Sequence, residues 1–197
     1  MKKGRVEAFS DGVIAIIVTI MVLEIKAPST FKFSAALSDL TYLSAYALSY
    51  FVICNGWYNH HYLLAITKWF SRRAFWANNI WLFTMSLIPV ATAWVSRFPF
   101  AKGPEYLYFT VYVLWDVAYY GLSFVLLRDQ RRTYPVVQDE IKTIKLFRPW
   151  MRALHFVLPI TGFILINWVP ILGVTFTFIE TITWFINVPE NGDQLER

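Results

Sequence analysis

The chain has 197 residues, of which 57% are apolar and 19% aromatic, including nine tryptophans. Only 16% are charged, against about 25% in an average soluble domain, so the composition excludes an ordinary soluble fold. It also excludes intrinsic disorder, which requires low hydrophobicity and high charge. The single cysteine, Cys54, excludes a disulfide framework or a thiolate metal cluster within one chain. The composition therefore indicates an integral membrane protein.

Five stretches nearly free of charged residues are candidates for membrane crossing, which takes about 20 residues in a helix. They cover 9–25 (with an uncharged core at 12–23), 40–67, 74–96, 106–127 and 153–189. The last is too long for one crossing, and Pro170 within it disfavours helix at the preceding residue. Division at 167–170 gives six spans. They lack the alternation of barrel strands, so we expect an all-α integral membrane protein with six transmembrane helices.

The positive charges predict the orientation of these spans. Six crossings place both termini on one side of the membrane, and that side receives 14 of the 18 Lys and Arg residues. Because basic residues concentrate in cytoplasmic loops, we expect both termini in the cytoplasm of a plasma-membrane protein. This bias accounts for the net charge of +5 without a nucleic-acid partner. We expect one transmembrane domain at 1–189 and a short polar cytoplasmic tail at 190–197.

The first span differs from the others because its core, 12–23, contains no aromatic residue. Ile16, Thr19, Ile20 and Leu23 are spaced i, i+3, i+4 and i+7, so they form one stripe on a helix. Such stripes are usually packing faces. The spacing alone therefore leaves open whether this one packs in a core or lines a pore.

Charged and polar residues stand at the start of this span. Charge at membrane depth is costly and marks a functional or tightly packed position, which draws attention to Asp11 and Arg5. A simpler alternative is that Ser10 and Asp11 cap a helix that begins near Gly12.

Three motifs carry a family resemblance: Arg5-x-x-x-Phe9-Ser10-Asp11 followed by Gly12-Val13-Ile14-Ala15-Ile16, then Trp57-Tyr58-Asn59-His60-His61, then Trp76-Ala77-Asn78 followed by Ser86-Leu87-Ile88-Pro89. In order and spacing the chain resembles the lysosomal potassium channel family, transmembrane protein 175, and its bacterial relatives. The motifs cover the first half of the chain. Its length and six spans resemble the single-repeat bacterial form.

The resemblance implies a potassium-selective cation channel, not an enzyme, that assembles as a homotetramer around a central pore lined by the first helix. It places the constriction at Ile16, with further pore-lining positions at Thr19, Ile20 and Leu23. K⁺ is then the permeating ion, present only transiently, and neither a cofactor nor a tightly bound metal is expected. A ring of apolar side chains can gate by dewetting. Glu24 at the pore mouth either concentrates cations or is simply a solvated helix end.

The same resemblance gives the motif residues a structural role. Arg5, Ser10 and Asp11 would fix the first helix through hydrogen bonds to the next two spans, and Phe9 belongs to the same motif. The expected partners are Trp57, His60 or His61, and Asn78. Loss of Asp11 would leave its partners unpaired in an apolar medium, at a cost on the order of several kcal/mol.

The sequence also bears on three other functions: hydrolysis, haem ligation and secondary transport. A membrane hydrolase lacks a nucleophile motif in this sequence, and haem ligation would require His60 or His61 to face His155. The main alternative is a proton- or cation-coupled secondary transporter, because Asp11, Asp116 and Glu180 are acidic residues within apolar spans. For Asp116 and Glu180 the sequence favours a structural role, as paired or hydrogen-bonded contacts between helices.

Overall fold

The computed structural model describes residues 2–25, 27, 30–31, 40–130 and 149–187, and in these residues every regular element is a helix. The helices are α1 (Lys3–Leu23), α3 (Leu40–Ile66), α4 (Arg72–Ser86), α5 (Ile88–Arg97), α6 (Lys102–Gln130), α8 (Pro149–Leu165) and α9 (Leu172–Asn187). The predicted all-α architecture is confirmed. The predicted tail at 190–197 lies outside the described residues, as does 131–148 of the connection between α6 and α8.

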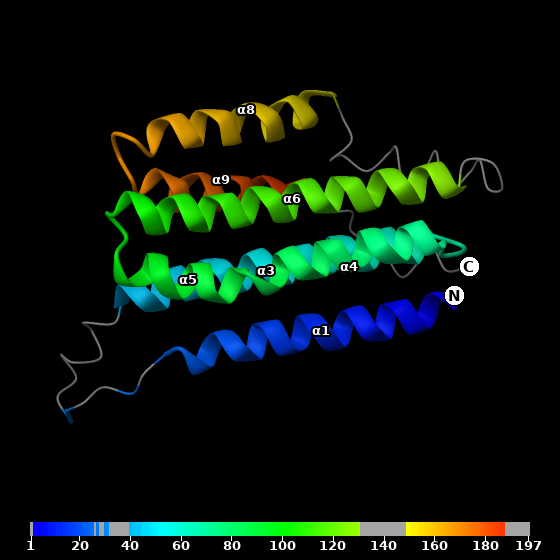
Figure 1. Cartoon of the computed structure of the whole chain (residues 1–197), viewed down its shortest axis with the longest axis horizontal. Coiled ribbons are helices and arrows are strands. Elements are labelled where there is room, and N and C mark those ends of the chain that lie inside the picture. The colour runs from blue at the N-terminus through cyan, green and yellow to red at the C-terminus, as the bar shows by residue number, and fades with distance from the viewer. Residues whose placement is uncertain (1, 26, 28–29, 32–39, 131–148, 188–197) are drawn as a thin grey trace.

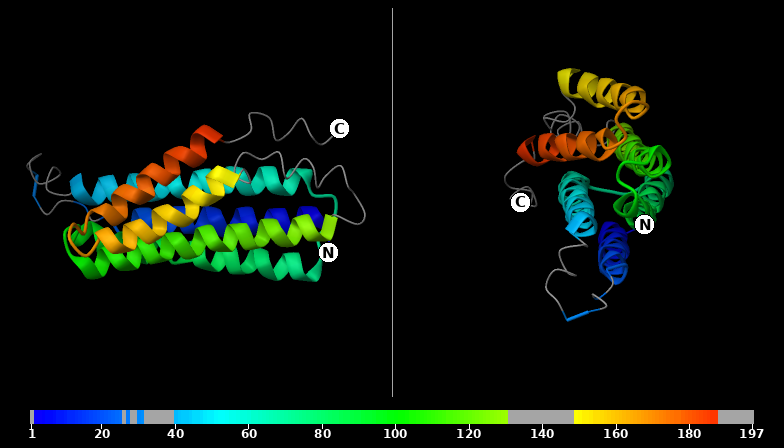
Figure 2. Two further views of the ribbon diagram at one scale, coloured as in Figure 1. Left: turned by 90° about the horizontal axis from the view of Figure 1, so that it is seen from above. Right: turned by 90° about the vertical axis from the view of Figure 1, so that its left-hand side faces the viewer.

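The helices lie side by side as long rods that alternate in direction (Figure 1). Helices α4 and α5 follow one another in a single rod. Seen end-on, α1 lies at one edge of the bundle and α8 at the opposite edge (Figure 2). Helix α1 packs against α3, α4 and α5, whereas α8 packs against α9 and α6.

Three described segments are long and apolar enough to cross a membrane: Lys3–Leu23, Arg72–Arg97 and Lys102–Gln130. Two shorter apolar helical segments, His155–Leu165 and Leu172–Ile186, lie towards the C-terminus. The rods coincide with the predicted stretches, and the predicted division at 167–170 falls in the turn between α8 and α9. The chain is therefore a helical protein with several membrane-spanning helices, while the count of six crossings stays a prediction.

Proline explains the interruption between α4 and α5. Pro89 has no backbone N–H, and its ring crowds the carbonyl four residues earlier, which breaks regular helical hydrogen bonding. The Leu87 N–H instead bonds the Thr84 carbonyl at 3.2 Å, and the Ala91 N–H resumes the helical pattern to Leu87 at 3.2 Å. The rod continues across this point, as a single span requires.

The capping alternative for the first span is wrong. Helix α1 begins at Lys3, after the N-cap residue Lys2, so Ser10 and Asp11 lie two turns inside it. The Ser10 hydroxyl donates to the Val6 carbonyl at 2.9 Å, one turn back in the same helix. The helix thus satisfies this hydroxyl internally. At its start, the Lys3 ammonium group donates to the Ala65 carbonyl at the end of α3, at 3.1 Å.

Aromatic rings fill the centre of the bundle. Trp81 of α4 and Trp115 of α6 are fully buried, with ring centroids 6.3 Å apart. Gly56 of α3 lies directly against Trp115, and a Cβ at this position would come within 2.3 Å of the indole ring. The absence of a side chain at Gly56 therefore lets α3 approach α6 closely. Helix α1 packs against α3 in this position.

Candidate functional site on helix α1

Helix α1 has two chemically different faces. The inner face is buried against α3, α4 and α5 and consists of Val6, Ser10, Ile14, Ile17 and Met21. The opposite face is exposed, and it carries the four residues predicted to line a pore. Ile16 is 58% exposed, Ile20 46% and Leu23 77%, and Thr19 between them is also exposed. The structure therefore places all four on one exposed stripe of the subunit.

The exposed stripe of α1 differs in composition from the other outward faces. Between Gly12 and Leu23 its exposed residues are glycine, alanine, threonine, valine, isoleucine and leucine. Each other long rod presents large aromatic side chains outward, as in Phe51, Phe83, Trp94, Phe124, Phe156 and Phe185. Small and aliphatic side chains allow helices to approach closely in a membrane. The stripe is thus suited to pack closely against another helix or to surround a narrow central axis.

Thr19 supplies the polar atom of the stripe. Its hydroxyl donates to the Ile16 carbonyl at 2.9 Å, within the same helix. Since a hydroxyl has one donor hydrogen and two acceptor lone pairs, this bond uses the hydrogen and leaves the lone pairs available. An oxygen that can only accept is the kind of group that stabilises a partly dehydrated cation.

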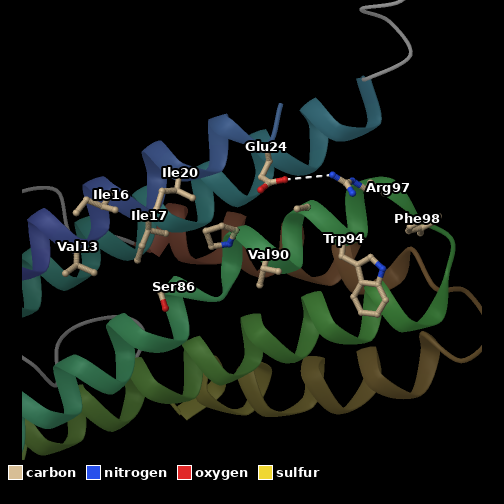
Figure 3. Close-up of a pocket in the computed structure, with 12 residues that line it drawn as sticks. Val13, Ile16, Ile17, Ile20, Glu24, Ser86, Val90, Trp94, Arg97 and Phe98 are labelled. Atoms are coloured by element: carbon tan, nitrogen blue, oxygen red, sulfur yellow. Dashed lines mark ion pairs between the residues drawn. The ribbon is translucent and has the colours of Figure 1, made fainter. Parts of the chain in front are cut away.

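A groove of about 880 Å³ runs between α1 and the α4–α5 rod (Figure 3). Ile16 and Ile20 line one side of it, and Val90 and Trp94 of α5 line the other. The groove is largely apolar along its length. Its charged groups, Glu24 and Arg97, lie at the end where α1 stops.

At that end, Glu24 faces Arg97, the last residue of α5. The Arg97 Nη2 atom lies 3.9 Å from Glu24 Oε2, and both side chains are about half exposed. Glu24 is therefore not an isolated anion at the mouth of the stripe, because a cation from α5 partly neutralises it. The sequence interpretation considered Glu24 alone and missed Arg97, which is remote along the chain.

A continuous hydrogen-bonded chain anchors the inner face of α1. The Asn78 side-chain amide on α4 donates to Ser10 Oγ at 2.9 Å. The Asn78 carbonyl oxygen meets His60 Nε2 of α3 at 2.7 Å. All three side chains are buried. Because that oxygen can only accept, His60 donates from Nε2, and the two contacts fix both the orientation of the amide and the histidine tautomer.

A second contact joins α1 to α3 nearer the surface. The Trp57 indole N–H donates to Asp11 Oδ1 at 2.8 Å, and the His61 ring stacks on Trp57 with centroids 5.9 Å apart. A hydrogen bond to an ionised carboxylate is stronger than one between neutral groups. Ser10 and Asp11, adjacent in sequence, therefore contact different partners on two neighbouring helices.

The structure does not bring every motif residue into these contacts. Arg5 is exposed, and within the described residues its guanidinium group has no hydrogen-bond partner. Phe9 is also exposed, on the outer side of α1. The geometry thus joins Ser10 and Asp11 to α3 and α4 and leaves Arg5 and Phe9 at the surface of the subunit.

The comparisons with known proteins concern this same region. A family model described as the endosomal/lysosomal potassium channel TMEM175 matches residues 5–89. A curated potassium channel from Chryseobacterium sp. (strain P1-3) is 34% identical over 187 residues, which are 94% of each protein. The chain belongs to the TMEM175 family.

Further TMEM175-family matches agree. A curated potassium channel from Streptomyces collinus is 31% identical over 121 residues, 59% of each protein. The crystal structure of a lysosomal potassium-selective channel TMEM175 homologue from Chamaesiphon minutus superposes with a TM-score of 0.67 at 25% identity, covering 94% of this chain and 97% of that one. The family match at 5–89 includes α1, α3 and α4, and hence the whole Ser10–Asn78–His60 chain.

Trp81 is a residue of this TMEM175-family site that the sequence interpretation missed. Its indole stacks on the His60 ring with centroids 4.5 Å apart and planes 10° from parallel. Trp81 follows Asn78 by three residues, so both lie on one face of α4, and that spacing was the available signal. The haem alternative required His60 or His61 to face His155, but His155 lies against Asp116 and Trp184 instead.

Proposed function

We propose that this TMEM175-family protein conducts K⁺ selectively, as a homotetramer in which four α1 helices surround a central pore. The observation that carries the proposal is the exposed, aromatic-free stripe on α1, which holds Ile16, Thr19, Ile20 and Leu23 while the opposite face is packed. The relatives named as potassium channels support the choice of ion. Secondary transport, the main alternative, finds no support in these matches.

The stripe explains how such a pore closes. Four Ile16 side chains that meet on an axis form an apolar constriction, and a narrow apolar constriction excludes water and hydrated ions. A small rotation or outward tilt of α1 widens the ring and lets water return. Because Ser10 and Asp11 connect α1 to α3 and α4, these contacts set the angle of the helix and therefore the width of the ring.

Selectivity in this proposal comes from Thr19 together with the constriction. K⁺ releases its hydration water more readily than Na⁺, so a narrow apolar ring admits it at lower cost. Four Thr19 hydroxyl oxygens, each with free lone pairs, then stabilise the partly dehydrated ion one turn beyond Ile16. K⁺ is the permeating ion throughout and occupies the pore transiently.

The distribution of charge supports a plasma-membrane orientation with cytoplasmic termini. One end of the bundle, where α1 and α4 begin and α3 and α6 end, carries Lys3, Arg5, Lys68, Arg72, Arg73 and Arg128. The other end carries Arg97 and Lys102. Basic residues favour the cytoplasmic side.

Reconstitution of the purified protein in a planar bilayer tests the function. We expect single-channel current steps and a reversal potential that follows a K⁺ gradient rather than a Na⁺ gradient. Coupled uptake without resolvable current steps would instead establish a transporter.

Ile16→Asn tests the position of the constriction. An amide at the narrowest ring holds water there, so we expect a larger current or weaker selectivity for K⁺ over Na⁺. Ile160→Asn is the matched control, because Ile160 is equally exposed but lies on α8 at the opposite edge of the bundle. If the two variants conduct alike, the narrow point is not at Ile16.

A further inference from the structure

Three titratable side chains are buried on the side of the bundle away from α1. Asp116 of α6 is 4% exposed, His155 of α8 is 5% exposed and Glu180 of α9 is 1% exposed. The proposed pore uses none of them. Charged groups in an apolar interior are costly unless they are paired and hydrogen-bonded. The protonation state of these three side chains therefore needs a physical explanation.

The contact between Asp116 and His155 requires a proton. Asp116 Oδ2 lies 3.6 Å from His155 Nδ1, and the Trp184 indole N–H points at the same Nδ1 atom at 3.4 Å. An indole nitrogen can only donate, so the Trp184 contact assigns a lone pair to Nδ1. Two lone pairs then face one another unless Asp116 is a carboxylic acid whose hydroxyl points at Nδ1. The proton that this contact requires therefore resides on Asp116.

Glu180 is buried without a compensating charge. Within the described residues, no donor lies in good hydrogen-bond geometry with either of its carboxylate oxygens or with Asp116 Oδ1. The neighbours that act on Glu180 are Asp116, which is itself acidic, and the Tyr112 phenol of α6. Two nearby carboxyl groups do not ionise together in an apolar site. A protonated, neutral Glu180 removes both the desolvation cost and the repulsion from Asp116.

The remaining groups around the cluster are neutral. Helix α6 adds the phenols of Tyr112, Tyr119 and Tyr120, and α3 adds the Tyr62 phenol and the Asn55 amide, which donates to the Thr181 carbonyl. Helix α9 adds the Trp184 indole, and no described lysine or arginine acts on either carboxyl group. The described residues also contain no group of three or more side chains arranged to hold a metal ion. The ligand that fits this chemistry is the proton.

We propose that Asp116, His155 and Glu180 form a buried proton-binding site, separate from α1, that holds α8 and α9 against α6 while it is protonated. One proton resides on Asp116, facing the Nδ1 lone pair of His155, and a second resides on Glu180. Loss of the second proton would place an unpaired carboxylate between α6 and α9. Since the carboxyl groups of the unfolded chain are ionised at neutral pH, the folded protein binds more protons, and its stability falls as pH rises.

Infrared spectroscopy of the purified full-length protein in nanodiscs tests this directly. A protonated carboxylic acid has a C=O stretch well separated from carboxylate bands. We expect such a band at neutral pH, loss of one component in Glu180→Gln, and loss or shift of another in Asp116→Asn. Glu105→Gln is the matched control, because Glu105 is also a buried glutamate but accepts a hydrogen bond from the Val174 N–H. The component lost in Glu180→Gln must survive in this control.

Two further measurements keep the test decisive if a variant fails to fold. In the wild-type protein, ¹³C-labelled glutamate must shift the band, and thermal stability must decline with rising pH. Glu180→Gln, if folded, flattens that decline, while Glu105→Gln leaves the component assigned to Glu180 in place. The proposal is overturned if no carboxylic acid band exists at neutral pH, if Glu180→Gln and Asp116→Asn each leave every component of the band in place, or if Na⁺ or K⁺ abolishes these components at constant pH. None of these results depends on whether α1 lines a pore.

Discussion

Asn78 is the residue at which three helices meet. Its amide donates to Ser10 of α1 and accepts from His60 of α3, while its own backbone belongs to α4. Among the described residues, the other side-chain hydrogen bond of Ser10 stays within α1 and goes to the Val6 carbonyl. Removal of the amide therefore leaves one buried donor on His60 and one buried acceptor on Ser10 without a partner.

Asn78→Leu replaces the amide by an apolar group of similar size. A stranded buried polar group costs about 1–3 kcal/mol, so we expect a clearly lower midpoint in thermal or denaturant unfolding and an altered open probability. Asn79→Leu is the control, because the half-buried Asn79 amide donates to the Phe75 carbonyl of its own helix and, among the described residues, joins no second helix. Equal destabilisation by the two substitutions would show that the contact with Ser10 and His60 adds nothing.

The ion pair between Glu24 and Arg97 predicts opposite effects of two neutral substitutions. Glu24→Gln removes the anion and should lower single-channel current at low ionic strength, whereas Arg97→Gln exposes the anion and should raise it. Both effects should fade at high salt, because screening shortens the range of surface charge. In the Glu24→Gln background, Arg97→Gln should no longer raise the current. A rise that persists there would mean that Arg97 acts on the ion directly.

At the scale of the element, α1 combines a fixed face with a free one. Buried Val6, Ser10, Ile14, Ile17 and Met21 recur every three or four residues, as do the exposed stripe residues on the opposite face. A helix anchored on one side by specific hydrogen bonds transmits small movements of its neighbours to its free side. The stripe therefore moves with α3 and α4.

Thr19→Val tests whether the free face selects K⁺. Valine keeps the shape of threonine but has no oxygen, so we expect a lower K⁺-to-Na⁺ permeability ratio, measured from reversal potentials under mixed-ion conditions, with little change in stability. Thr161→Val is the matched control, because Thr161 is likewise partly exposed on a helix and its hydroxyl donates only to the Val157 carbonyl. An unchanged ratio in Thr19→Val would remove the hydroxyl from the selectivity mechanism.

The sequence predicted the positions of the helices better than it predicted the side-chain contacts between them. Hydropathy predicted the rods because a membrane requires long apolar helices, and the spacing of Ile16 and Leu23 predicted a shared face. The start of α1 at Lys3 was missed because polar residues at a membrane surface do not end a helix. The pairs Glu24–Arg97 and Asp116–His155 could not be predicted, since each joins helices whose relative rotation depends on packing.

At the scale of the whole molecule, α1 is a peripheral helix of its own subunit. It lies at one edge of the bundle (Figure 2), and between Gly12 and Leu23 its free face carries none of the large aromatics found on the other outward faces. A monomer in lipid gives no reason for such a difference. An assembly in which the α1 edges of several subunits meet supplies one, because small side chains are needed where helices crowd around an axis.

Disulfide trapping tests that assembly. The only native cysteine is Cys54, so Cys54→Ser gives a cysteine-free background into which Leu23→Cys is introduced at the most exposed position of the stripe. If four α1 helices surround one axis, mild oxidation should link these thiols in pairs, which gives covalent dimers on a denaturing gel. Native mass spectrometry of the same sample should show tetramers. Phe156→Cys, on the outer face of α8, should stay monomeric under the same oxidation. Crosslinking at Phe156→Cys but not at Leu23→Cys would place α8 on the axis and α1 in the lipid.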